Sequence, residues 1–78
     1  MSTRSDERWL ARYGTVRVEF QFQGWQARDV YAAQLIVRGV PEVEAVSSSR
    51  RAVLRLLRSR WEAHMRRRDL WVRASSLL

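Results

Sequence analysis

The sequence predicts an α+β fold in which a small antiparallel sheet is covered by one long helix. Apolar and polar residues alternate through residues 15–23, which is typical of a strand with one buried face. Apolar residues recur every three or four positions through residues 49–68, which is typical of an amphipathic helix. Since the chain has 78 residues, we expect a single domain, 1–78, near the lower size limit for an independent core.

The first element is expected to be a short helix over residues 5–13. Ser5 can cap it, Asp6 and Glu7 suit the positive end of the helix dipole, and Gly14 can end it in a left-handed conformation. Trp9 then lies on the inner face and anchors this helix to the sheet or to a second subunit.

Two strands are expected next, near 15–23 and near 30–37, with Gly24 at a turn between them. Residues 26–38 also fit a helix, because they are rich in Ala and are followed by Gly39 and Pro41. We favour the strand in the second half of this segment, because apolar residues alternate there and can pair with the preceding strand: Tyr31, Ala33, Leu35 and Val37.

A third short strand is expected near 42–46, and the serines at 47–49 then cap the long helix at 49–68. One face of that helix is apolar: Val53, Leu54, Leu57, Trp61, His64 and Met65. Asp69 is expected to end the helix, and a fourth strand is expected near 70–74. In this arrangement Trp61 and Trp71 both belong to the core.

All fifteen basic residues are arginine, and eight of them lie between Arg50 and Arg68, where Glu62 is the only acid. This segment therefore has a charge of +7, the net charge of the whole chain. A GC-rich genome can explain the absence of lysine, but it does not explain the clustering. Guanidinium groups bind carboxylates and phosphates through two parallel hydrogen bonds, so the segment indicates an anionic partner.

The residue inventory argues against an enzyme, a cofactor site and a metal site. There is no cysteine, and the single histidine, His64, lies on the apolar face between Trp61 and Met65, as packing histidines do. The three glycines are isolated, so no phosphate-binding loop exists, and no base accompanies the serines. No apolar run is long enough to cross a membrane and none resembles a signal peptide, so we expect a cytoplasmic protein.

The candidate partner-binding residues are the arginines of the outer helix face and one turn residue: Arg51, Arg55, Arg58, Arg66, Arg67 and Trp25. Trp25 is included because Trp and Arg are enriched among the residues that dominate binding energy. The alternative is that the arginines only solvate an outer face. Because so small a core often gains stability by self-association, a homodimer is the default expectation.

The order of elements over residues 15–74 resembles the partial HicB-like fold of bacterial antitoxins. The matching residues are Val40-Pro41, Val43, Ala45, the serines 47–49 and Ala52-Val53-Leu54, although Glu42 stands where that family has glycine. The resemblance implies a small module that covers a nucleic-acid-processing partner without catalysis. Small phage-encoded anti-CRISPR inhibitors have a similar profile of size and charge.

The sequence thus predicts a non-enzymatic interaction protein that inhibits or occludes a nucleic-acid-processing effector through its arginine-rich helix face. The partner would be an acidic or nucleic-acid-binding protein complex. The alternative is a direct nucleic-acid-binding protein that contacts phosphates without reading sequence.

Overall fold

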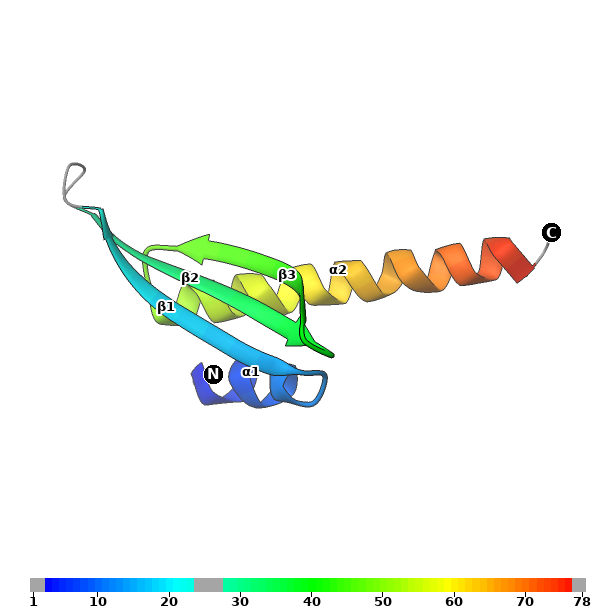
Figure 1. Cartoon of the computed structure of the whole chain (residues 1–78), viewed down its shortest axis with the longest axis horizontal. Coiled ribbons are helices and arrows are strands. Elements are labelled where there is room, and N and C mark those ends of the chain that lie inside the picture. Colours follow the sequence, from blue (N-terminus) through cyan, green and yellow to red (C-terminus); the bar gives the residue numbers. More distant parts are fainter. Residues whose placement is uncertain (1–2, 24–27, 77–78) are drawn as a thin grey trace.

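The computed structural model describes the backbone of residues 3–23 and 28–76 and the side chains of residues 5–21 and 30–73. The elements are α1 (Thr3–Ala11), β1 (Thr15–Gln23), β2 (Arg28–Val37), β3 (Val40–Ser47) and α2 (Arg50–Ser76). The predicted α+β class is confirmed (Figure 1). The strand favoured for the second half of residues 26–38 is also correct, since β2 occupies that segment.

The sheet is antiparallel with the strand order β1-β2-β3. The alternation of β1 places Val16 opposite Leu35 and Val18 opposite Ala33, and Ala33 also lies opposite Ala45 of β3. Because side chains alternate between the faces of a strand, these apolar residues all lie on one face of the sheet. That face is the one covered by the helices.

Both helices lie side by side on this face, α2 against β3 and β2, and α1 beside α2 and against β1 (Figure 1). The buried core joins all three parts of the molecule: Leu10, Ala33, Leu35, Ala45, Val53, Leu54, Leu57 and Trp61. The apolar stripe predicted for the long helix is therefore confirmed through Trp61, whereas His64 and Met65 are half-buried. The serine cap is confirmed too, because Ser49 Oγ accepts a hydrogen bond from the Ala52 N–H at 3.1 Å.

The ends of α1 differ from the prediction. The helix begins at Thr3, so Ser5 lies inside its first turn, and it ends at Ala11 rather than at residue 13. Gly14 does not provide a left-handed stop, since Gly39 is the only glycine with positive φ among the described residues. Gly14 is needed for close approach instead: a Cβ there would lie 2.2 Å from the carbonyl oxygen of Ile36.

The fourth strand predicted near 70–74 is wrong, because α2 continues as a helix to Ser76. Asp69 does not end it: aspartate disfavours a helix only weakly, and no Gly or Pro follows within the element. Five alternating residues were too short a pattern to exclude a helix. Trp71, predicted in the core, is 73% exposed.

Over its 27 residues α2 is about 40 Å long, at about 1.5 Å per residue. The last part of α2 projects beyond the sheet (Figure 1), and the longest dimension of the molecule is 52 Å. None of the described helices is apolar enough over a sufficient length to cross a membrane.

Two irregularities shape the β2–β3 hairpin next to α2. Its turn consists of Arg38 and Gly39, with φ values of 54° and 80°. In β3 the register shifts so that Leu35 pairs with Val43 and Ile36 with Pro41, leaving Glu42 as an extra, unpaired residue. Such a bulge changes the direction of the side chain it contains.

Candidate functional site

Three of the predicted arginines lie on the flank of α2 that borders α1. Arg51 and Arg55 are exposed and make no hydrogen bond or ion pair with any described residue, and Arg66 approaches only Glu62, at 4.0 Å. We call Arg51, Arg55 and Arg66 the arginine surface. Their guanidinium groups are available to a partner, because these side chains are exposed and form no close ion pair.

Arg58, which was predicted with this group, is instead engaged within the molecule. Its guanidinium lies 3.2 Å from Asp6 of α1 and 3.3 Å from Glu62, and it covers the ring of Trp9 at 4.5 Å from the centroid. Its side chain is only 31% exposed. We therefore interpret Arg58 as a contact between the two helices.

Arg67 lies on the other flank of α2, beside the edge of the sheet. It borders a shallow hollow with Arg60, His64, Glu42 and Glu44. Arg60 donates a hydrogen bond to the backbone carbonyl of Glu44 at 2.6 Å. One arginine of this flank therefore joins α2 to β3. Arg67 itself is exposed.

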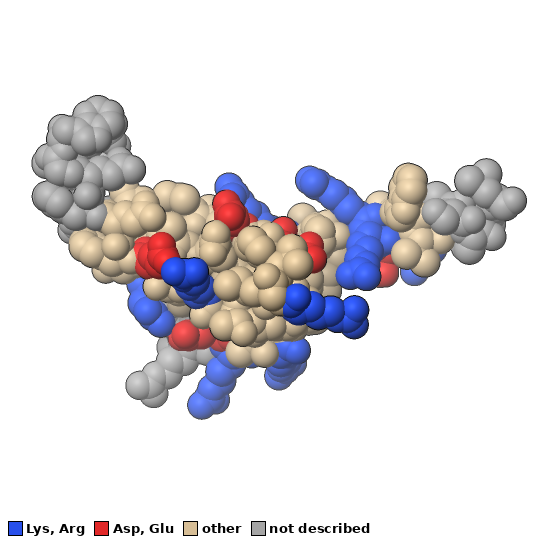
Figure 2. Space-filling model, viewed as in Figure 1, with Lys and Arg blue, Asp and Glu red and all other residues tan. Residues whose placement is uncertain are grey.

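The end of α2 that projects from the sheet exposes apolar side chains among its arginines. Leu70, Trp71 and Val72 are 65%, 73% and 58% exposed. In Figure 2, acidic side chains are spread over the body of the molecule, whereas arginines also gather where α2 leaves it. This projecting end, residues 66–73, combines the two side-chain types that dominate protein interfaces, tryptophan and arginine.

The three remaining tryptophans were predicted to have different roles. Trp25, predicted as an interface residue, lies outside the described residues. Trp9 is half-buried and contacts α2 through Arg58, whose guanidinium covers its ring, while its centroid lies 5.1 Å from that of Tyr13 just after α1. Trp61 is buried, as predicted.

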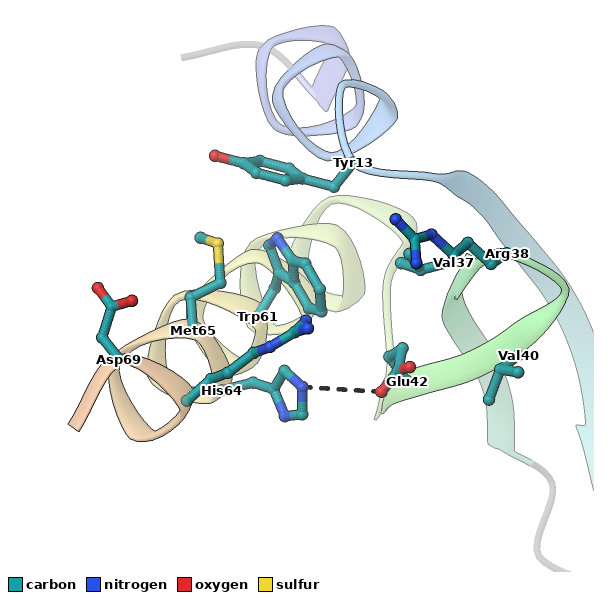
Figure 3. A pocket seen from close by; sticks show the side chains of 10 residues that line it. Tyr13, Val37, Arg38, Val40, Glu42, Trp61, His64, Met65 and Asp69 are labelled. Carbon is teal, nitrogen blue, oxygen red and sulfur yellow. Dashed lines mark ion pairs between the residues drawn. The ribbon is translucent and has the colours of Figure 1, made fainter. Parts of the chain in front are cut away.

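Sequence reasoning missed a pocket of about 550 Å³ that opens where α2 leaves the sheet (Figure 3). We call it the Trp61 pocket. Its walls come from the end of α1, the β2–β3 hairpin and the middle of α2: Tyr13, Val37, Arg38, Val40, Glu42, Trp61, His64, Met65, Arg68 and Asp69. One signal could have pointed to it, namely Arg-Gly in a two-residue hairpin turn where Asn-Gly is favoured.

His64 behaves as a packing residue rather than as part of a polar cluster. Its ring stacks on Trp61, with centroids 5.2 Å apart and planes at 19°, and its Nε2 lies 3.7 Å from Glu42. Within residues 5–21 and 30–73, no three His, Asp or Glu side chains are grouped to hold a metal ion.

Comparisons with family models, with curated proteins and with solved structures gave no match for this chain. Three strands precede α2 in the chain, but the final strand expected from the resemblance is absent, because residues 70–74 are helical.

Proposed function

We propose that this protein is a non-enzymatic interaction module that occludes a nucleic-acid-processing effector, such as a toxin or a defence complex. The observation that supports this most is the arginine surface: three exposed cations on one flank of a helix that also projects beyond the sheet. An acidic groove on the effector, of the kind that carboxylates form, matches these guanidinium groups.

The exposed apolar residues favour a protein partner over bare nucleic acid. A phosphate backbone offers no apolar surface on which the exposed side chains of Leu70, Trp71 and Val72 could be buried. A protein surface can bury them next to arginines that pair with its acids. The acid Glu62, which lies between Arg58 and Arg66, would also repel phosphates.

The test is capture of effector proteins from a nuclease-treated lysate of the source organism, with the purified protein as bait. The triple variant Arg51→Glu, Arg55→Glu, Arg66→Glu should lose a nucleic-acid-processing complex that the parent protein retains. A matched control is Arg8→Glu, Arg12→Glu, Arg17→Glu, which reverses three exposed arginines elsewhere and should retain the complex. If the α2 triple variant captures the same complex, the arginine surface is only a solvated face.

Direct nucleic-acid binding is the rival function, and a salt series separates it. A direct binder loses affinity linearly on a log–log plot of affinity against salt, with a slope of about −0.9 for each phosphate neutralised on a duplex. Binding of this kind, with a slope reduced by about three in the triple variant, would replace the occlusion proposal. We expect no steep slope with either a duplex or a single strand.

A further inference from the structure

The Trp61 pocket is a concave site with apolar walls and a few converging polar groups, as small-molecule sites have. Its volume of about 550 Å³ lies within the range of roughly 300–1,000 Å³ that such sites occupy. It opens on the sheet side of α2, so it is separate from the arginine surface. The apolar part of the lining consists of Tyr13, Val37, Val40, Trp61 and Met65.

The indole N–H of Trp61 is an unused donor at this site. Trp61 is 5% exposed, and its Nε1 has no hydrogen-bond partner within the described part of the chain. Figure 3 shows the nitrogen on the indole edge that faces Tyr13, on the pocket side of the ring. Since buried donors are normally paired, this N–H can bind an acceptor atom that the described residues do not supply, such as one from a ligand.

Arg38 brings further hydrogen-bond donors to the pocket, and its backbone has an unfavourable conformation in the turn. Its φ of 54° is left-handed, a conformation that Asn, Asp and Gly adopt much more readily than arginine. Strained residues of this kind concentrate at binding sites. In Figure 3 the guanidinium of Arg38 extends from the turn across the pocket toward Trp61.

The lining holds two guanidinium groups that are available to an anionic ligand. Arg38 and Arg68 border the pocket from the hairpin and from α2, and neither contacts an acid among residues 5–21 and 30–73. Of the two lining carboxylates, Glu42 already faces His64 at 3.7 Å, because the bulge turns it toward α2. Arg38, Arg68 and Asp69 are all exposed, and the two guanidinium groups make no ion pair with either lining carboxylate, so both can bind an anionic group of a ligand.

We propose that the Trp61 pocket binds a small carboxylate with a flat apolar body. The carboxylate would accept hydrogen bonds from Arg38 and Arg68 in the geometry that guanidinium groups prefer. The flat body would lie between Tyr13, Trp61 and Met65, where aromatic faces and a thioether offer stacking contacts. An acceptor atom of the ligand would take the Trp61 N–H.

The experiment follows the indole N–H resonances of the ¹⁵N-labelled protein while 2-naphthoate is added. The chain has four tryptophans, and loss of one peak in Trp61→Phe identifies the relevant one. We expect a saturable downfield shift of the Trp61 peak. The neutral isostere 2-naphthamide should bind about tenfold more weakly, as expected for the loss of a charge-assisted hydrogen bond.

Two variants connect the signal to the site. Arg38→Asn removes the guanidinium but places a residue suited to the left-handed turn, so it should fold at least as well as the parent and bind about tenfold more weakly. Arg55→Ala, on the arginine surface, should leave the titration unchanged. The proposal is overturned if the Trp61 peak does not shift, if the amide binds as well as the acid, or if Arg38→Asn binds normally.

Discussion

The guanidinium of Arg58 lies over the ring of Trp9, at 4.5 Å from its centroid, and this contact joins α1 to α2. The same guanidinium reaches Asp6, whose side chain is 14% exposed. Arg58 therefore stabilises the fold, although its spacing along the helix matches that of the exposed arginines. Variants that test partner binding should leave Arg58 intact.

Arg58→Ala should lower the free energy of unfolding by about 1–2 kcal/mol, because it removes a cation–π contact and two ion pairs that are partly shielded from water. Urea denaturation followed by tryptophan fluorescence measures the loss. The matched control is Arg55→Ala, an exposed residue one turn earlier, which should change stability by less than about 0.5 kcal/mol. Equal effects of the two substitutions would mean that the contact with Trp9 contributes nothing.

Gly14→Ala should destabilise the protein by about 1–3 kcal/mol or more, the usual effect of forcing an extra carbon into a packed contact. The added Cβ would lie 2.2 Å from the backbone oxygen of Ile36, and that oxygen cannot move without distorting β2. Thermal unfolding should show a lower melting temperature. Gly39→Ala is a useful comparison: nothing lies within 4 Å of a Cβ there, so any loss comes from the positive φ alone.

Truncating the two tryptophans of α2 should have very different effects on the stability of the protein. Trp61→Ala should cost about 3–5 kcal/mol, the range for a large aromatic residue removed from a core. Trp71→Ala should change stability by no more than about 0.5 kcal/mol, since its side chain is 73% exposed. If Trp71→Ala destabilises the protein as much as Trp61→Ala does, the end of α2 must be packed in solution.

Arg38→Asn should raise the free energy of unfolding by about 1 kcal/mol, because Asn tolerates the left-handed conformation that costs other residues about 1–2 kcal/mol. Chemical denaturation measures the gain. Arg38→Lys, which keeps the charge and the strain, should give no such gain. An unchanged midpoint for Arg38→Asn would show that the turn tolerates arginine without strain.

The elements that local patterns specify were predictable from the sequence. The alternation of β1, the Ser49 cap and the apolar stripe that ends at Trp61 each depend on neighbours a few positions away. The end of α2 was not predictable in this way. Leu70-Trp71-Val72 fits either a strand or a helix, and only the absence of a sheet neighbour at that place decides between them.

The site was less predictable than the fold, because it depends on contacts between distant parts of the chain. Arg58 resembles Arg55 in sequence, and only the position of α1 distinguishes the two. The Trp61 pocket brings together Tyr13, Arg38 and Arg68, which no spacing rule connects. Its one local signal was an arginine in a turn that favours Asn-Gly.

The two halves of α2 should tolerate substitution differently, because only the first half is packed against the core. Substitutions at Val53, Leu54, Leu57 or Trp61 disturb the core and reduce stability, so few of them can persist. Substitutions between Arg66 and Val72 meet little packing, since these side chains are exposed, so they should cost little in folding. A protein built in this way can vary the surface at one end of a helix while the rest of the fold stays the same.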